Sequence, residues 1–563
     1  MPDLLFGEYR PDANDRNQEH TRTLSNVLPQ SDGYGPVKAF QAYTEALAAQ
    51  CRGFFYARNA DRSVSVFAGT ATKLYRLDKT TLTWVDVSAS SGTYSSLDDD
   101  ANWSFCQFNN FVFATQRNAV VQVYNLASST EFATLAGSPP QAGSIAVVGR
   151  FLVLCNLLSS AYRIQWSALN NTTKWTPGTD FSDFQDLPSG GVPLKIIGGE
   201  LGIILQESEI RRMIYQPGSD LVFQIDRVAE QVGIAHPDSV TAAGNMIYCY
   251  STRGFIGINA SGEITNIGEE RVNRTFQQTA DLDRPQYIIG VSDPLSSTIL
   301  FTYPMASAST SGFDAALVFN YVLNKWSPVT IEGEYVASLS RPGLTLENMD
   351  ALAPGALTIT GAADNGSGKI RITVAHTSSL TTGDYKTISG VAGTTEANGT
   401  WAITVINGTT FDLDGSTFAN TYTSGGVVGG SMDDMTFSFD AVSLAPLPRL
   451  CWCDTTHALG FLSGLPLEAT LTTATSELDR GKRIDINNLR PITDAVDAYA
   501  AVVMQERRDA VASVSAETAM DSDGNCFVIE NTRYAAARVR IPAGTDWSYV
   551  SGVTPEFRQG GRF

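Results

Sequence analysis

Cysteine and histidine side chains come closest to a metal-ligand pattern near residue 450 of this sequence. Cys451 and Cys453 are two residues apart in an apolar run, so a β-strand there would carry both thiols on one face. A structural zinc ion needs about four such ligands. His457 could be a third, but no fourth is evident in the sequence. We therefore expect two buried thiols here and no metal site.

The four histidines give no pattern of nucleophilic catalysis. A Ser-His-Asp or Cys-His group requires a histidine held beside an activated nucleophile. The histidines are far apart in the chain, and no Gly-x-Ser-x-Gly motif supplies an exposed serine. They are His20, His236, His376 and His457. The sequence therefore predicts no catalytic residues.

Two short motifs match ligand-binding loops only in part. Residues 521–525 read Asp-Ser-Asp-Gly-Asn, but a calcium loop needs a closing Glu where Thr532 stands. An Asp-Gly hairpin turn fits this stretch better. Residues 366–369 read Gly-Ser-Gly-Lys, but Ile370 occupies the place of the Ser or Thr that binds magnesium in a phosphate loop. We expect no cofactor-binding residues.

Two acidic clusters, at 98–100 and 432–434, leave an enzymatic interpretation open. Paired carboxylates can serve glycoside hydrolysis or bind a metal ion. Adjacent aspartates in polar segments are more typical of solvated turns. We interpret both clusters as turns, so an enzyme remains possible but unsupported.

The composition indicates an all-β protein that is acidic. Apolar residues make up 43% of the chain, enough for a core, and Val, Ile, Thr, Phe and Tyr dominate the apolar runs. The net charge of −19 argues against a protein that grips nucleic acid by a basic surface. It leaves room for a protein past which DNA moves without adhering, because like charges repel.

Cellular context follows from what the sequence lacks. Its seven cysteines form no disulfide framework. The first residues show no basic segment followed by an apolar core, and no run of about 18 apolar residues could span a membrane. We expect synthesis and folding in a cytoplasm, without a membrane span.

A short apolar segment recurs at intervals of about 40 to 53 residues. A four-stranded blade with its turns needs about that many residues, so the repeat predicts a β-propeller. The segments are 64–69, 110–114, 149–154, 201–205, 245–249 and 297–301. Trp84, Trp175 and Trp326 each follow a turn, and we expect them to cap the blade cores. The number of blades stays open.

Breaks in composition divide the chain into five predicted parts. They are an N-terminal arm (1–50), propeller blades (51–352), an inserted β-sandwich (353–432), closing propeller strands (433–465) and a C-terminal β-domain (466–563). Within the arm, 42–49 could form a short helix. The insertion is rich in Thr, Gly and Ser and alternates as strands do. The blade pattern resumes at 435–440, which places the sandwich inside the propeller.

Several phrases of the chain, taken in order, resemble the tail nozzle proteins of short-tailed bacteriophages. This family is also called tail tubular protein B or packaged-DNA stabilisation protein. The phrases are Leu-Ser-Asn-Val-Leu-Pro (24–29) with Gly-Tyr-Gly-Pro (33–36), Phe-Ala-Gly-Thr (67–70) with Lys-Leu-Tyr (73–75), Ile-Gln-Trp-Ser-Ala (164–168) with Trp175, His-Ala-Leu-Gly-Phe-Leu-Ser-Gly (457–464), and Ile-Pro-Ala-Gly (541–544) with Trp547. The insertion instead resembles the immunoglobulin-like domains that decorate virion proteins. The predicted fold is all-β, with a β-propeller core, an inserted immunoglobulin-like β-sandwich and a C-terminal β-domain.

The resemblance implies a structural protein of the virion tail, with no catalytic motif. Six copies would form a ring below the portal and the adaptor proteins, and tail fibres, spikes or a distal tip could attach to it. The ring would retain packaged double-stranded DNA and conduct it during ejection. If part of the negative charge lines the lumen, it would keep phosphates from adhering.

Two other functions remain in view. A host-surface glycan-binding or glycan-degrading tail protein would show exposed aromatic clusters in a groove, or two carboxylates at glycosidase spacing. A free-standing propeller that binds partner proteins would be encoded away from phage structural genes.

We predict that the insertion projects from the rim of the propeller and is dispensable for ring formation, because its strands are polar and rich in threonine. Phage that carry a deletion of 355–432 should still assemble particles, which electron microscopy would count. Loss of assembly would contradict this prediction.

Overall fold

The structure is a computed structural model, and it describes residues 3–13, 20–219, 221–259, 261–307, 311–340, 357–374, 377, 380–429, 448–479, 482–507 and 510–559. Their regular structure is almost entirely β, in many small antiparallel sheets, which confirms the all-β prediction. The helical segments are α1 (Asn273–Thr279) and the short 3-10 helices Ala89–Ser91, Pro237–Ser239, Pro285–Tyr287 and Thr395–Ala397. None of the described helices is long and apolar enough to cross a membrane.

Two compact units divide the chain. The first comprises 1–77, 83–341 and 447–563, and the second comprises 78–82 and 342–446.

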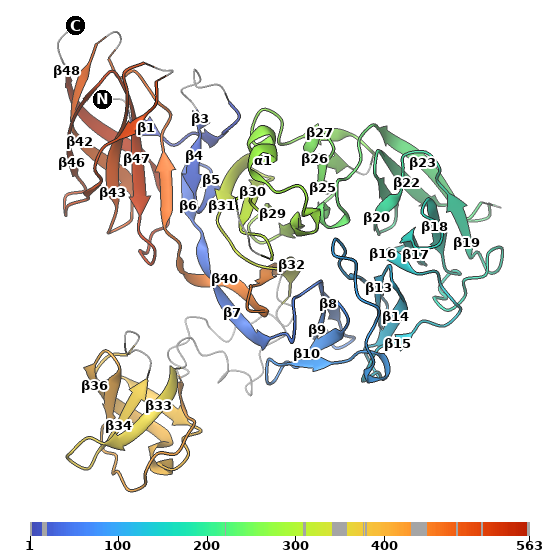
Figure 1. Ribbon diagram of the computed structural model, residues 1–563, viewed down its shortest axis with the longest axis horizontal. Helices are drawn as coiled ribbons and strands as arrows, with labels where there is room; N and C mark the ends of the chain where they lie inside the picture. Colours follow the sequence, from blue (N-terminus) through green and yellow to red (C-terminus); the bar gives the residue numbers. More distant parts are fainter. Residues whose placement is uncertain are drawn as a thin grey trace. The chain divides into compact units, whose positions relative to one another are not determined.

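Seven four-stranded antiparallel sheets make up most of the described part of the first unit. The first three are β8 (Phe54–Arg58), β9 (Val64–Gly69), β10 (Leu74–Leu77) and β11 (Trp84–Asp86); β12 (Ser104–Phe108), β13 (Phe111–Gln116), β14 (Ala119–Asn125) and β15 (Ala133–Thr134); β16 (Ala142–Val148), β17 (Phe151–Leu157), β18 (Arg163–Trp166) and β19 (Asp183–Asp186). The next three are β20 (Pro193–Ile197), β21 (Gly202–Gln206), β22 (Glu209–Tyr215) and β23 (Phe223–Glu230); β24 (Thr241–Ala243), β25 (Met246–Ser251), β26 (Gly254–Asn259) and β27 (Ile264–Asn266); β28 (Gly290–Asp293), β29 (Thr298–Tyr303), β30 (Ala315–Asn320) and β31 (Lys325–Val329). The seventh joins β32 (Tyr335–Leu339), β39 (Arg449–Cys453), β40 (Ala458–Pro466) and β7 (Lys38–Ala46). In Figure 1 the first six follow one another in colour order, from blue to green.

The recurring apolar segments of the sequence are the second strands of the first six sheets: β9, β13, β17, β21, β25 and β29. Each of these strands is paired on both edges, by the first and the third strand of its sheet. All six residues of β9 and of β29 are buried. A strand covered on both faces needs apolar side chains at every position rather than an alternation, which explains the repeat.

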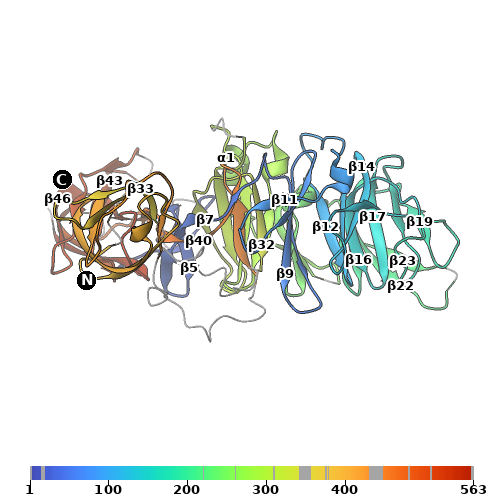
Figure 2. The ribbon, with the colours of Figure 1, turned by 90° about the horizontal axis from the view of Figure 1, so that it is seen from below.

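Every sheet shares a hydrophobic core with the next one, and the seventh shares one with the first. Residues of adjacent sheets that belong to the same core are Phe67 and Val112, Phe113 and Leu152, Val153 and Ile204, Leu205 and Ile256, Phe255 and Phe301, Val318 and Trp452, and Cys453 and Val66. The first strands β12 and β16 are in contact and lie side by side in Figure 2. The succession of packed sheets therefore returns to its start.

Tryptophans lie in these cores as expected. Trp326 and Trp175 are buried, and each indole N–H donates to a backbone carbonyl, of Ile267 and of Thr172 respectively, at 2.8 Å. Trp84 is half-buried and donates to Glu45 O at 3.1 Å.

The seventh sheet is closed by a strand from the opposite end of the chain. β7 pairs with β40, so that Ala42 lies opposite Gly460 and Ala46 opposite Ala458. Both views show the two strands side by side (Figures 1 and 2). The prediction of a short helix at 42–49 is wrong, since 38–46 form strand β7. Pairing with β40 outweighs the helix propensity of the alanines and the glutamate there.

Strands from both chain ends also form a pair of six-stranded sheets. One contains β1 (Leu4–Leu5), β5 (Val27–Gln30), β6 (Gly33–Pro36), β42 (Ile484–Thr493), β46 (Cys526–Thr532) and β48 (Val550–Gln559). The other contains β4 (Thr23–Ser25), β41 (Ala469–Thr472), β43 (Tyr499–Gln505), β44 (Ser513–Val514), β45 (Thr518–Ala519) and β47 (Tyr534–Ile541). A parallel pair, β2 (Glu8–Tyr9) and β3 (His20–Thr21), adjoins them in sequence. We call the two sheets the terminal sandwich, because their inner residues share one core.

The terminal sandwich changes the interpretation of both chain ends. The segment expected to be an arm, residues 1–50, supplies strands to it rather than irregular chain. At the other end of the chain, 550–559 form β48, whose residues pair with β42, β6 and β1.

Six strands of the second unit pair into a closed barrel in the order β33 (Leu357–Asp364), β34 (Ile370–Val374), β37 (Thr410–Leu413), β36 (Gly399–Asn407), β35 (Tyr385–Ser389) and β38 (Val427–Gly429). This differs from the immunoglobulin-like sandwich expected for the insertion, because β33 and β36 each pair on both edges and no two separate sheets remain. Its core is its own and includes Ile372, Ile403 and Phe411. The blade pattern expected at 435–440 lies outside the described residues.

We predict that Gly460→Ala destabilises the first unit by about 1–3 kcal/mol, the usual cost of overpacking. A Cβ on Gly460 would lie 2.3 Å from the Gln41 carbonyl oxygen and 2.4 Å from the Phe40 ring, so β7 would have to move away from β40. Urea unfolding of the full chain measures the change. Gly408→Ala is the matched control, because nothing lies within 4 Å of the added methyl group. Equal stability of the two variants would contradict the prediction.

Candidate functional site

The described histidines are held by structural contacts. His236 is buried, its Nδ1 accepts from the Asp238 backbone N–H at 3.3 Å, and its Nε2 lies 2.8 Å from the Asp100 carbonyl oxygen. His20 lies on the short strand β3. His376 lies outside the described residues. Neither ring nitrogen of His236 is left to activate a serine or cysteine, so this histidine acts as a joint between two loops.

The two thiols of β39 are buried, as the sequence predicted, and the structure places them in the core between the seventh and first sheets. Cys451 and Cys453 are fully buried, and Cys451 Sγ donates to Ala337 O at 3.3 Å. The structure adds Cys51, which hydrogen-bonds Cys453; this bond and burial raise the pKa of the Cys453 thiol far above its usual range. Among the described residues, no three or more His, Cys, Asp or Glu side chains gather as metal ligands.

A buried carboxylate that the sequence did not single out lies beside these thiols. Glu334 accepts from the Cys51 backbone N–H at 2.9 Å and lies 2.8 Å from His457 Nδ1, while its own N–H donates to Cys453 O at 2.8 Å. It thus joins three segments that are far apart in the chain: the link from β7 to β8, the start of β32, and the turn from β39 to β40. Burial raises the pKa of Glu334, and the contacts with Cys51 and His457 oppose that rise.

The two glycine-bearing motifs are tight turns; 366–369 joins the paired strands β33 and β34, whereas 521–525 leads from β45 to β46, which lie in different sheets. Asp521 Oδ1 accepts from the N–H groups of Asp523 and Asn525, and Gly524 takes the left-handed φ of +81° that such a turn needs. In 366–369 the backbone N–H groups donate to Asp364 and Asn365 instead of facing a phosphate. The turn expected at 521–525 is present, but the hairpin expected there is wrong, because β45 pairs with β43 and β46 pairs with β42.

The side chains of 98–100 are exposed, which confirms a solvated loop. The backbone of this loop is held by hydrogen bonds from Arg52. Arg52 donates to the carbonyl oxygens of Asp98 and Asp99 at 2.9 Å, to that of Ala101, and to Asn102 Oδ1 at 3.1 Å. The second acidic cluster, 432–434, lies outside the described residues.

A polar cavity of about 340 Å³ lies between this loop and the link that leads into β24. Four carboxylates line it, those of Asp98, Asp100, Glu207 and Asp238, together with Lys195 and Arg117. Asp238 Oδ2 accepts from Asn102 Nδ2 at 2.8 Å, and its Oδ1 lies 3.8 Å from Lys195 Nζ. Arg52 donates to Asn102, and Asn102 donates to Asp238, so these three side chains form one hydrogen-bonded chain. This chain joins loops of several sheets and fixes the shape of the cavity.

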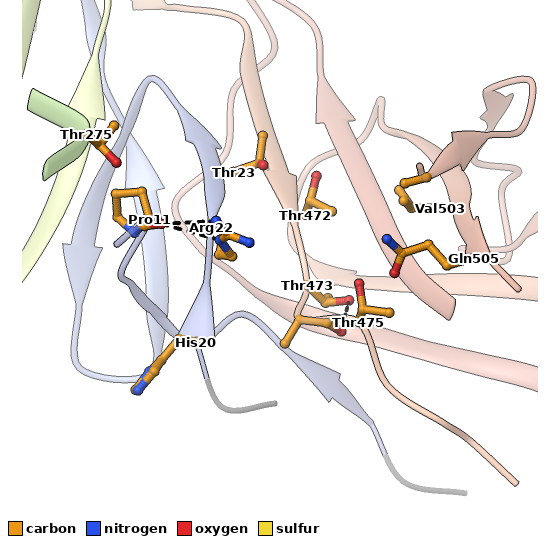
Figure 3. Close-up of a pocket in the computed structure, with 12 residues that line it drawn as sticks. Pro11, His20, Arg22, Thr23, Thr275, Thr472, Thr473, Thr475, Val503 and Gln505 are labelled. Atoms are coloured by element: carbon orange, nitrogen blue, oxygen red, sulfur yellow. Dashed lines mark hydrogen bonds between the residues drawn. The ribbon is translucent and has the colours of Figure 1, made fainter. Parts of the chain in front are cut away.

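A second cavity, of about 410 Å³, lies at the seam between the two chain ends. In Figure 3, Pro11 and Arg22 stand on one side, and Thr472, Thr473 and Thr475 stand on the other. The Arg22 guanidinium donates to Pro11 O at 3.3 Å and 3.4 Å. The lining is rich in threonine hydroxyl groups and also contains His20.

Comparisons with known proteins leave the family open. No family model matches the chain, and no curated protein matches it. Among solved structures it is similar to the computationally designed Ika8 protein, at 10% identity over 54% of this chain and 94% of that one, with a TM-score of 0.31. It is also similar to the dihydro-heme d1 dehydrogenase NirN, at 13% identity, with 70% of this chain and 76% of that one covered and a TM-score of 0.28. Likenesses this weak carry no argument about function.

We predict that Glu334 makes stability depend on pH in a defined direction. Because the folded pKa of Glu334 is raised, its contribution is complete below the ordinary value of 4.5 and is lost as the pH rises through the folded value. The free energy of unfolding of the wild type minus that of Glu334→Gln should therefore fall between pH 4 and pH 7. Urea unfolding across this range measures it. Glu200→Gln, at an exposed position, should give a flat difference. A difference that rises with pH for Glu334→Gln would contradict the account.

Proposed function

We propose that this protein is a structural component of the virion tail, a nozzle of the kind formed in short-tailed bacteriophages. In this proposal the seven sheets are blades of a β-propeller, six copies form a ring below the portal and the adaptor, and packaged DNA is retained by the ring and passes through it during ejection. The chain performs no catalysis.

The observation that carries the proposal is the position of the phrases that resemble the nozzle family. Three of the five lie where distant parts of the chain are joined. The phrase 24–36 supplies β4, β5 and β6 to the terminal sandwich, and 457–464 falls on β40 beside β7. The phrase 541–547 begins at the last residue of β47, where Ile541 lies opposite Ala469 of β41. Residues that join distant segments favour a role in which the body must stay rigid under load.

Asn26 within the first phrase illustrates such a joint. Its backbone is left-handed, with φ of +57°, a conformation that Asn tolerates better than most residues. Its N–H donates to Pro328 O at 3.2 Å and its Oδ1 accepts from the Thr330 N–H at 2.8 Å, both beside the sixth sheet. Its Nδ2 donates to Glu468 O at 3.0 Å, in the terminal sandwich. One side chain thereby ties the sandwich to the sheets.

Charge also supports the proposal. A surplus of carboxylates, with 58 acidic and 39 basic residues, suits a wall along which DNA slides without binding. The closed barrel of the second unit has its own core and suits a decoration carried by the ring.

We predict that purified phage particles contain this chain at half the copy number of the portal protein, about six per particle, as expected for a closed ring. Quantitative mass spectrometry with the portal as the internal standard measures it. A copy number of a peripheral fibre or spike would contradict the ring, and absence from the particle would overturn the structural role and favour a glycan-active or partner-binding protein instead.

A further inference from the structure

A third cavity, about 600 Å³ in volume, lies among the first strands of five sheets. We call it the inner pocket; its lining comes from β8, β12, β16, β20 and β32, with Trp103 just before β12. Pockets that hold small ligands span roughly 300–1,000 Å³ and are largely preformed. Here each wall is a strand whose backbone is paired within its sheet, so the pocket exists before any ligand arrives.

Aromatic rings cover much of the wall of the inner pocket. Phe55 and Phe105 are stacked with ring centroids 5.9 Å apart and planes 9° from parallel, and Tyr56 continues the stack at 6.4 Å from Phe55. These three side chains are only partly buried. An accessible stack of flat rings favours a flat, apolar partner, because aromatic rings prefer offset-stacked or edge-on contacts.

The charges that line the inner pocket are all positive. They are Arg58, which is exposed, and Lys195, whose side chain is 21% exposed. In a chain with 19 more acidic than basic residues this is unusual. Asp238, the carboxylate beside Lys195, lines the polar cavity and is not among the residues that line the inner pocket.

Lys195 lines both cavities and keeps donors available. Its Nζ lies 3.8 Å from Asp238 Oδ1, which is longer than a hydrogen bond, and an ammonium group has three N–H donors. Asp238 is in turn held by Asn102. Tyr335 lines the same pocket, and burial, followed by the charge of Asp238, raises the pKa of its phenol well above the usual value. Tyr335 therefore stays neutral, and its O–H can donate a hydrogen bond as well.

We propose that the inner pocket binds a small aromatic carboxylate or sulfonate. Its ring would stack on Phe55 and Phe105, and its anionic group would accept hydrogen bonds from Lys195 and Tyr335. This site goes beyond the proposed role in the tail, since it belongs to a single chain and requires no ring.

The test uses the full chain and the fluorescent aromatic sulfonate 8-anilinonaphthalene-1-sulfonate. We expect saturable binding at one site, displaced by benzoate. Lys195→Gln should weaken binding about tenfold, or about 1.4 kcal/mol, because it removes a charged hydrogen-bond donor to the anion. Lys174→Gln removes the same charge from an exposed loop and should leave binding unchanged. Circular dichroism would establish that each variant is folded.

Exposed apolar surface elsewhere is the main competitor for this dye. Phe527 and Ile529 on β46 are 63% and 92% exposed, so the double variant Phe527→Ser with Ile529→Ser removes that surface. The proposal requires that the saturable site survive in this double variant. It is overturned if the wild type shows no saturable binding, if the double variant loses it, or if Lys195→Gln binds as the wild type does. If Lys195→Gln fails to fold, Tyr335→Phe replaces it, because it removes the other proposed hydrogen-bond donor. A wild-type affinity in that variant would overturn the proposal.

Discussion

The antiparallel pairing of β7 with β40 is the contact on which the rest of the first unit depends. It joins segments more than 400 residues apart; the Leu459 N–H donates to the Thr44 hydroxyl across a separation of 415 residues. Without it the seventh sheet would keep three strands and an open edge beside the first sheet. The entropic cost of closing so long a loop is moderate, because this cost grows slowly with loop length. Once the loop is closed, each of the seven sheets shares a hydrophobic core with the sheet on either side of it.

Three further features make this closure tight. Gly460 permits the β7 backbone to approach within a distance that no Cβ would allow. Glu334 holds the neighbouring links through Cys51 and His457. The terminal sandwich then pairs the same two chain ends a second time, through Leu24 with Leu471 and Tyr34 with Val550. A body closed twice in this way resists local opening, which suits a protein that must withstand the pressure of packaged DNA in the role we propose.

Strand positions inside the sheets were predictable because their cause is local. A strand buried on both faces shows a continuous apolar run, and those runs recur with the length of one sheet, as for β9 and β29. The roles of β7 and β48 were not predictable, since both are polar or alanine-rich and owe their conformation to partners at the other end of the chain. The barrel in place of a sandwich follows from pairing at β33 and β36, which alternation of side chains does not encode. Glu334 and Lys195 carry no motif either, because only the fold brings their partners to them.

Native-state amide hydrogen exchange of the full chain, read by mass spectrometry at the level of single strands, tests most directly whether the chain ends hold the structure closed. The account predicts that peptides covering β7 and β40 exchange as slowly as those covering β13 and β17, through global unfolding. The account would be contradicted if β7 exchanged faster by two or more orders of magnitude while the other sheets stayed protected. The succession of packed sheets would then persist without the strand that closes it.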